Sequence, residues 1–351
     1  MIDIIITIYN TPIDALIRCF NSIIKQKNEK WNVIIIDDGS KKEIAKWLDN
    51  YCNNNQKFSV YHFKNNGISE ARNIGIKLSQ NDYITFVDSD DEITESFLSD
   101  AYTILDNYDV DLIIGSTEID YGNNKKTCAI KQNKYIEGNS IKQLLGYMLS
   151  SKNSKNEMHF NNILVGRTYP KIYKKSVLNM VKFDNELFLH EDNLFSIDVL
   201  TKVDKVYVTD KIWYIYYQND YSITHSKYDE KFSIQELLFA DKIRERKPLF
   251  EKNGVVNQYY YRIATIAILY LKMLINQNRL PMKSINRLFE QSVFNEIIYL
   301  KVDCIMDVSK KDKFFIKILQ IKSKKIKILI FSIIVSISKI IHKRGDKNVK
   351  K

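Results

Sequence analysis

Residues 83–91 read Tyr83-Ile84-Thr85-Phe86-Val87-Asp88-Ser89-Asp90-Asp91, an apolar run that ends in three carboxylates. The run predicts a β-strand, and strand residues two apart point to the same side, so Asp88 and Asp90 are expected to project together at its end. Ligands of open α/β sheets bind at that end of the strands. Carboxylate oxygens favour Mg²⁺ or Mn²⁺, commonly shared with a phosphate. The stretch therefore predicts a metal–diphosphate site; the alternative is a polar turn in which Asp91 caps the next helix.

Other apolar segments alternate with helical ones around this strand. Residues 2–8 and 33–36 are β-branched runs without a helical period, as in buried parallel strands, and residues 59–63 predict a third strand. Helices are expected after Pro12, around residues 44–48 and through Ala71. Four alternations in about ninety residues predict a parallel doubly wound sheet. A fifth strand is expected over residues 111–115, and the pattern turns helical from about residue 232.

Polar residues follow three of the predicted strands, and adjacent parallel strands would bring them to one edge of the sheet: Thr7, Tyr9 and Asn10, then Asp37 and Asp38, then Asp88 and Asp90. The chain lacks both G-x-G-x-x-G after the first strand and a P-loop motif, which argues against a dinucleotide binder or P-loop enzyme. A carboxylate of Asp37 or Asp38 is suited to accept a hydrogen bond from a nucleobase. The alternative is a solvated strand-to-helix turn with a helix cap.

The segment from Asn65 to Gly75 places Arg72 in or near the first turns of a helix. A fixed guanidinium there is suited to contact a phosphate or to brace the metal carboxylates. The alternative is a surface arginine that pairs with Glu70 or with nothing.

Composition and cysteine usage indicate a folded cytoplasmic protein. The chain has 351 residues, enough for one large core or two modest ones, and its 45% hydrophobic content is that of a globular protein. Four scattered cysteines without C-x-x-C spacing are typical of reduced thiols. Met1 leads directly into a strand rather than an export signal.

Much of the net charge of +11 lies in the tail from Lys322 onward, where Asp346 is the single acid. Residues 328–338 are apolar but too short to span a bilayer, which takes about 20 residues. As a helix they place Ser332 and Ser336 on one stripe with Lys339 and Lys343. The pattern predicts either an in-plane helix on the inner face of the cell membrane or a helix packed on the C-terminal bundle. The same helix is a candidate homodimer contact.

Together these motifs resemble glycosyltransferase family 2, whose members are inverting, nucleotide-sugar-dependent enzymes with a GT-A fold. They stand in the family's order over residues 1–95, although Thr7-Ile8 replaces the usual Pro-Val. The resemblance implies a mostly parallel α/β sheet flanked by helices, plus a C-terminal helical region. The expected domains are a catalytic domain over 1–225 (nucleotide-sugar half about 1–115, acceptor half about 116–225), a helical region over 226–320 and a basic tail over 321–351.

The resemblance also implies roles for individual residues. Those assigned to nucleotide-sugar binding are Thr7, Tyr9, Asp37, Asp38, Asn66, Arg72, Asp88 and Ser89. Mn²⁺ or Mg²⁺ would be held by Asp90, as the more direct ligand, and Asp88. A UDP-sugar is the expected donor because this family uses it most often.

Residues 171–175 and 190–195 resemble the family's acceptor-side region, where a Glu-Asp pair ends a loop and opens a helix. The match implies Asp192 as the catalytic base and Glu191 as the residue that orients it or binds acceptor; the alternative is that Asp192 caps its helix. Residues 213–224 resemble the family's Tyr-x-Tyr-Arg…Ser-Ile-Thr segment. Gln218 replaces the arginine there, which leaves His225 or Lys227 as candidates for the diphosphate contact.

The predicted function is inverting transfer from a nucleotide-sugar to a glycan acceptor, free or lipid-linked, in bacterial surface-polysaccharide synthesis. A sugar-1-phosphate nucleotidyltransferase is an alternative, but it would want a Gly-rich basic loop where Tyr9-Asn10-Thr11-Pro12 stands. A basic protein that binds nucleic acid or another anionic surface is a second alternative. It predicts basic and aromatic residues interleaved on the folded domain, whereas residues 81–120 are acidic, so no nucleic-acid partner is expected.

Overall fold

The structure is a computed structural model that describes residues 1–122, 124–130, 132–150, 166–218, 230–276, 286, 289–304, 308–331 and 333–334. The chain forms two compact units. The first comprises Met1–Leu145 and His159–Ser226, and the second comprises Gly146–Met158 and Lys227–Lys351. The domain boundaries expected from the sequence stay predictions.

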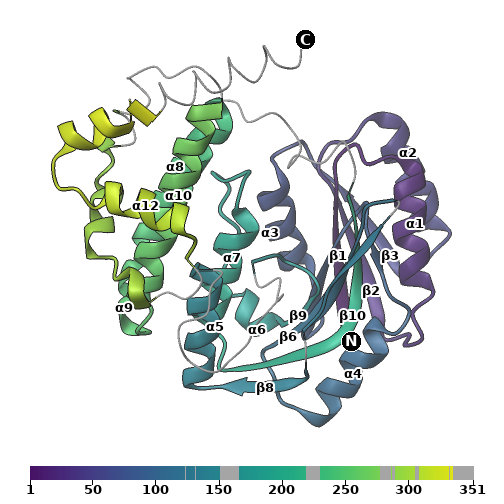
Figure 1. Cartoon of the computed structure of the whole chain (residues 1–351). Helices are drawn as coiled ribbons and strands as arrows, with labels where there is room; N and C mark the ends of the chain where they lie inside the picture. Colours follow the sequence, from purple (N-terminus) through teal and green to yellow (C-terminus); the bar gives the residue numbers. More distant parts are fainter. Residues whose placement is uncertain are drawn as a thin grey trace. The chain divides into compact units, whose positions relative to one another are not determined.

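The first unit is built on a mixed sheet with the strand order β3-β2-β1-β4-β9-β6-β10-β5. Figure 1 labels most of these strands. β7 pairs with β6, and β8 pairs with β10. The strands are β1 (Ile2–Ile8), β2 (Trp31–Asp37), β3 (Phe58–His62), β4 (Tyr83–Asp88), β5 (Glu92–Ile93), β6 (Leu112–Asp120), β7 (Lys125–Cys128), β8 (Lys134–Glu137), β9 (Lys171–Lys174) and β10 (Lys205–Tyr217). β1 to β4 are parallel to one another, whereas β9 runs antiparallel between β4 and β6.

Helices connect these strands and cover both faces of the sheet. Their bounds are α1 (Ile13–Ile24), α2 (Lys42–Asn53), α3 (Ile68–Leu78), α4 (Phe97–Asn107), α5 (Asn139–Ser150), α6 (Lys175–Leu178) and α7 (Glu191–Leu200). Figure 1 shows α1 and α2 on one side of β1 to β3 and α3 on the other. The GT-A-type α/β sheet flanked by helices is therefore confirmed.

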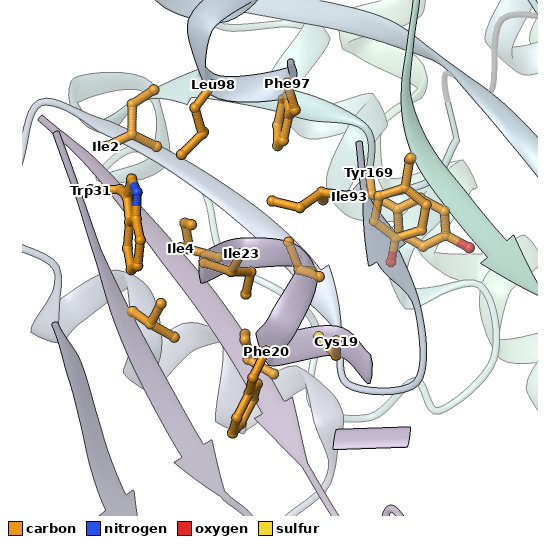
Figure 2. Packing of buried hydrophobic residues seen from close by; sticks show 14 of the residues in the cluster. Ile2, Ile4, Cys19, Phe20, Ile23, Trp31, Ile93, Phe97, Leu98 and Tyr169 are labelled. Atoms are coloured by element: carbon orange, nitrogen blue, oxygen red, sulfur yellow. The ribbon is translucent and has the colours of Figure 1, made fainter. Parts of the chain in front are cut away.

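Alternation along β2 explains why both faces are covered. Val33 and Ile35 belong to the larger core, which also takes in residues of α1, α2 and α4. Ile34 and Ile36 face the other way and pack with Ala71 of α3. Successive strand residues point to opposite faces, so a continuous apolar run needs cover on both sides. Figure 2 shows part of the larger core, where labelled side chains from β1, α1 and α4 gather on one side of the sheet.

The predicted elements are present, with differences after the fifth strand and in the acidic segment that follows β4. β6 continues past Gly115 to Asp120, and the region after it contains β7, β8 and α5. The interpretation of Asp91 as a helix cap is wrong, because α4 begins only at Phe97 and Asp91 is followed by β5. β4 ends at Asp88, and Asp90 lies in the turn that the Asp91 N–H closes onto the Asp88 carbonyl at 3.1 Å. Strand alternation therefore does not extend to Asp90, and the expectation that alternation makes Asp88 and Asp90 project together is wrong.

The second unit is helical in its described part, as expected from residue 232 onward. It contains α8 (Glu230–Glu245), α9 (Lys247–Lys252), α10 (Val256–Asn276), α12 (Lys310–Leu319) and the 3₁₀ segments η2 (Ser292–Tyr299) and η3 (Val302–Cys304). Ile263, Ile266 and Tyr270 lie on the buried side of α10 at helical spacing. No helix in the described residues has the length and apolar character needed to cross a membrane.

The described part of the basic tail is helical over residues 324–331. Phe331 is buried, with its ring centroid 5.7 Å from that of Phe289, so this part packs on the second unit. Ile326, Leu329 and Ile333 are exposed. The stripe predicted for Ser332, Ser336, Lys339 and Lys343 lies outside the described residues.

Gly75 lets α3 lie directly against β1. A Cβ atom at Gly75 would stand 2.5 Å from Cγ2 of Ile5, which is too close for any real contact. Ile5 is buried in the middle of β1, and its Cγ2 is attached to the rigid branch point of the side chain. The helix that carries Arg72 is thus positioned by the absence of one methyl group.

We expect Gly75→Ala to lower the free energy of unfolding by about 1–3 kcal/mol, because the added methyl overpacks the contact with Ile5. The sign of this change distinguishes the two cases, because the same substitution in a helix without such a contact raises the free energy of unfolding by about 1 kcal/mol. Urea unfolding of the two proteins measures the difference. A variant as stable as wild type would contradict the close packing of α3 on β1.

Candidate active site

The carboxyl ends of β1, β2 and β4 meet at one edge of the sheet, as predicted. In the parallel register Ile8 lies opposite Asp37, and Thr7 lies opposite Asp88. The end of the central strand β1 is therefore flanked by the acidic ends of both neighbours. Tyr9 follows β1 at this edge with 57% of its surface exposed, so its ring is available to a ligand.

Asp37 and Asp38 are buried and hold the loops of this edge together. Asp37 accepts hydrogen bonds from the Ser40 N–H at 3.0 Å and shares one of 2.7 Å with Nδ1 of His62. Asp38 accepts from the backbone N–H groups of Asn66 (2.8 Å) and Gly67 (2.9 Å). Both carboxylates thus have partners within the chain, and their predicted contact with a base stays a prediction.

His62 is a site-edge residue that the sequence motifs did not indicate. Its two ring nitrogens contact Asp37 and, at 3.1 Å, Asp49. Burial lowers the pKa of His62, but the hydrogen bonds and charges of these two aspartates outweigh it and hold the pKa above its usual value. His62 therefore ties β3 to the end of β2.

The three carboxylates at the end of β4 and in the turn after it, Asp88, Asp90 and Asp91, lie in different environments. Asp91 is 1% exposed and accepts hydrogen bonds from the Tyr214 hydroxyl (2.8 Å) and the Tyr217 N–H (2.9 Å). Burial, followed by the charges of Asp88 and Asp90, raises the pKa of Asp91 well above its usual value. Asp91 is thus an anchor to β10 rather than a member of the exposed edge.

The middle residues of the acidic turn (residues 88–91) lie toward α1 and the loop before it. The Arg18 guanidinium donates a hydrogen bond to the backbone carbonyl of Asp90. Ser89 and Thr11 hydroxyls lie 2.7 Å apart. The turn that carries the predicted metal ligands is therefore held from two sides.

Arg72 is 4% exposed and bridges two carboxylates from distant parts of the chain. Its Nη2 donates to Oδ1 of Asp88 and its Nη1 to Oε1 of Glu191, both at 3.1 Å. Its Cζ also lies 5.3 Å from the ring centroid of Phe183. The alternative of a surface arginine paired with Glu70 is wrong. The guanidinium instead connects the end of β4 to the start of α7.

Glu191 and Asp192 open α7, as the family pattern implied. The residue before the helix is His190, in the left-handed region with φ 67°, so Asp192 lies within the first turn and is not the cap. A carboxylate there is stabilised by the helix dipole. Burial, and next the charge of Asp192, raise the pKa of Glu191 to about 7 against the opposing effect of Arg72.

Two basic residues beside α7 were not identified from the sequence. Lys171 is buried and donates through Nζ to the Arg167 carbonyl and, at 3.2 Å, to the Ser196 hydroxyl. Burial lowers the pKa of Lys171 to about 7, against the effect of the Asp192 charge. The guanidinium of Arg167 lies over the ring of Tyr216 on β10. Lys171 lies in the segment that resembles the family's acceptor-side region, but its contact with Ser196 and the contact of Arg167 with Tyr216 join segments that are distant in sequence.

The donor set at the acidic turn fits a cation shared with a substrate phosphate. Among the described residues, no three His, Cys, Asp or Glu side chains come together as a protein-only metal cage. Asp88 keeps a partly exposed carboxylate, and Asp90 follows it in the turn. Mg²⁺ is typically bound by one or two carboxylates, with phosphate and water completing its shell.

One family segment is only partly described. Gln218 is exposed, and its backbone N–H donates to the Asp120 carbonyl at 3.0 Å. Residues 222–224, His225 and Lys227 lie outside the described residues, so the predicted diphosphate contact there stays a prediction.

Comparison with known protein sequences places this edge in a known family. Residues 3–165 match the family described as Glycosyl transferase family 2. The chain is 26% identical over 238 residues to the glycosyltransferase GlyG of Streptococcus pneumoniae serotype 4, over 65% of this chain and 74% of GlyG. It is 24% identical to EpsJ of Bacillus subtilis, named an uncharacterized glycosyltransferase, over 65% of this chain and 64% of EpsJ.

A third relative is the poly(ribitol-phosphate) beta-N-acetylglucosaminyltransferase TarS of Staphylococcus aureus. It is 26% identical over 60% of this chain and 34% of TarS. The crystal structure of S. aureus TarS 1–349 in complex with UDP-GlcNAc matches with a TM-score of 0.59 and 19% identity, over 91% of this chain and 90% of that chain. The same TarS segment without UDP-GlcNAc matches with a TM-score of 0.55 and 18% identity. At this identity the likeness shows the fold.

The raised pKa of Glu191 predicts a pH dependence of stability. Below pH 4.5 the carboxyl is protonated in both the folded and the unfolded chain. Between pH 4.5 and about 7 the unfolded chain loses this proton first, so the free energy of unfolding falls as pH rises. Glu191→Gln removes this contribution and keeps an acceptor for Arg72. We expect the free energy of unfolding of the variant, taken relative to that of wild type, to rise by on the order of 1–3 kcal/mol from pH 4.5 to pH 8.

Thermal or urea unfolding at the two pH values measures this change. A stability difference between variant and wild type that is the same at both values would show that the pKa of Glu191 is not raised by folding.

Proposed function

Because the chain belongs to glycosyltransferase family 2 through residues 3–165, we propose that it transfers a sugar with inversion from a UDP-sugar to a hydroxyl of a glycan acceptor in cell-surface polysaccharide synthesis. The observation that carries the proposal is the Arg72 bridge between Asp88 and Glu191. Through it, the acidic turn suited to a diphosphate and the Glu-Asp pair suited to acceptor activation share one buried cation.

Donor binding is assigned to the edge formed by β1, β2 and β4. The exposed ring of Tyr9 is suited to pack on the nucleoside, with Thr7 and Asp37 beside it and Asn66 on the loop held by Asp38. The names of the matched TarS structures, which contain UDP-GlcNAc and UDP, support a uridine nucleotide. Within the part of the chain that the structure describes, no feature favours sugar-1-phosphate nucleotidyl transfer.

A divalent cation, Mn²⁺ or Mg²⁺, is assigned to Asp90 with Asp88, beside Ser89. When bound there it offsets the negative charge of the leaving diphosphate as a Lewis acid. Asp88 already gives one oxygen to Arg72, so the guanidinium limits how that carboxylate turns. The Asp88 carboxylate is thus shared between Arg72 and the assigned cation site.

Asp192 is assigned as the general base. Its carboxylate takes the proton of the acceptor hydroxyl as that oxygen forms a bond to the anomeric carbon and the bond to the diphosphate oxygen breaks. A single displacement of this kind inverts the anomeric configuration. Glu191 is held by Arg72, and the charge of Asp192 lies close enough to raise the pKa of Glu191. Glu191 is therefore assigned to orienting Asp192 or the acceptor.

The second unit is assigned to bringing the enzyme to its acceptor. Ile326, Leu329 and Ile333 are exposed on one side of the tail helix, with Lys324 and Lys325 exposed beside them. Apolar side chains flanked by lysines suit the surface of an anionic membrane. The acceptor that fits this placement is a lipid-linked glycan on the inner face of the membrane. As an alternative, the exposed apolar side of the tail helix forms a homodimer contact.

We expect Asp192→Asn to keep donor binding and to lose ~10²–10⁴-fold in turnover, because positioned bases contribute about that factor. The readout is UDP release from a UDP-sugar in the presence of a cell-envelope glycan fraction, with UDP affinity measured separately. Asp198→Asn, on the same helix six residues later, is the matched control and should transfer normally. Wild-type turnover in Asp192→Asn would remove Asp192 as the base.

UDP with Mn²⁺ should raise the melting temperature of wild type, because a ligand that binds only the folded state stabilises it by about 2.7 kcal/mol at a hundred times its Kd. Asp90→Ala should abolish the part of this shift that requires metal. The control Asp106→Ala removes an exposed carboxylate of α4 and should leave the shift intact. The same UDP shift with and without Mn²⁺, in all three proteins, would exclude a metal site at Asp90.

A further inference from the structure

Arg167 lies beside the base assigned in the proposed mechanism. Its carbonyl accepts hydrogen bonds from Nζ of Lys171 and, at 3.3 Å, from the hydroxyl of Ser196. Ser196 stands four residues after Asp192 on α7, and residues at this spacing are neighbours on one helix face, about 6 Å apart. The backbone of Arg167 is therefore fixed one helical turn from Asp192.

Two tyrosines, one on β10 and one just before β9, hold the guanidinium of Arg167. Its Cζ lies 4.7 Å from the ring centroid of Tyr216, and its Nη1 donates to the hydroxyl of Tyr169 at 2.8 Å. Tyr169 in turn stacks on Tyr214 at a centroid distance of 3.9 Å. Stacking and one hydrogen bond leave most of the guanidinium's five N–H donors for a ligand.

The same stack of rings leads to the acidic turn. The hydroxyl of Tyr214 accepts from the Asp88 N–H at 3.0 Å and donates to Asp91 at 2.8 Å. Arg167 therefore stands between the first turn of α7, with Asp192, and the turn assigned to the donor diphosphate. Burial lowers the pKa of Arg167, while Tyr169, Tyr216 and Asp192 raise it more, which agrees with this placement.

The charge of Arg167 lacks the carboxylate partner that comparable arginines have. Within the described chain no carboxylate oxygen lies within 4.0 Å of it, whereas Arg72 pairs with Asp88 and Glu191, and Arg18 pairs with Glu92 at 3.5 Å. Removing a cation from water without a partner is costly. A half-buried, rigidly stacked guanidinium with open donors is suited to bind a planar or tetrahedral oxyanion in a bidentate manner.

We propose that Arg167, braced by Tyr169 and Tyr216, is a binding site for a phosphate group of the substrates that meet at Asp192. The proposal rests on the proposed transferase function. It supplies a cation beside β10, the strand that ends one residue before Gln218, where the sequence resemblance would place an arginine. The phosphate belongs either to the donor diphosphate or to the acceptor, and these two sources give different binding results.

The test uses calorimetric titration of the full chain with Mn²⁺ present. The variants are Arg167→Met, which keeps the length and the contact with the rings, and Arg167→Lys, which keeps the charge and loses the fork. Lys57→Met is the control, because it removes a cation that stacks on Trp31 at 4.5 Å and has Glu29 as partner. The probes are UDP, uridine and, on UDP-loaded protein, glycerol 3-phosphate.

If the donor supplies the phosphate, Arg167→Met weakens UDP about tenfold or more, or ~1.4 kcal/mol, and uridine binds as in wild type. If the acceptor supplies it, UDP binds normally, and the UDP-loaded variant loses the glycerol 3-phosphate binding that wild type shows. Arg167→Lys should give a smaller loss of the same kind. It replaces Arg167→Met as the deciding variant if the latter does not show a wild-type-like thermal transition.

Variants that bind UDP and glycerol 3-phosphate like wild type overturn the proposal and leave the transferase function standing. The proposal is also overturned if wild type binds UDP but no glycerol 3-phosphate and the variants bind UDP equally well. A wild-type protein that binds neither UDP nor glycerol 3-phosphate overturns both this proposal and the function on which it rests.

Discussion

The ion-paired burial of Arg72 is the constraint on which the site depends. A guanidinium that is 4% exposed must have anionic partners, and it finds them in Asp88 at the end of β4 and Glu191 at the start of α7. Breaking such a pair from one side costs about 3–5 kcal/mol, because the remaining charge is left buried. The distance between the acidic turn and the Glu-Asp pair is thereby set by one planar side chain. Gly75 supports this arrangement, because it lets α3 approach β1 closely.

Most of the motif carboxylates are engaged in holding the edge of the sheet rather than facing solvent. Asp38 organises the Asn66-Gly67 loop, and Asp91 joins the acidic turn to β10 through Tyr214 and Tyr217. Charge repulsion among Asp88, Asp90 and Asp91 is reduced because burial favours the protonated form of Asp91. The loops at this edge are thus fixed before any ligand binds. Group transfer is faster when the groups that position the substrates are already in place.

The fold and the positions of the main motifs were predictable from local patterns. Apolar runs without a helical period predicted β1, β2 and β4, and the polar residues after them predicted a shared edge. The alternatives that proved wrong concern side chains with a distant partner. Asp91 reads locally as a helix cap but bonds to Tyr214, 123 residues away. Arg72 reads locally as a partner of Glu70 but bonds to Glu191, 119 residues away.

The sequence by itself determined the first four strands and the helices between them, the acidic turn and the family resemblance of residues 3–165, because these depend on patterns within short stretches of the chain. Tertiary structure alone decided which charges meet and which side chains lose water. Arg167 illustrates the difference: its own segment carries no motif, and its importance comes from Tyr216 on β10 and Ser196 on α7. Pairing and desolvation depend on distances in space, and these are defined only once the sheet has brought remote segments together.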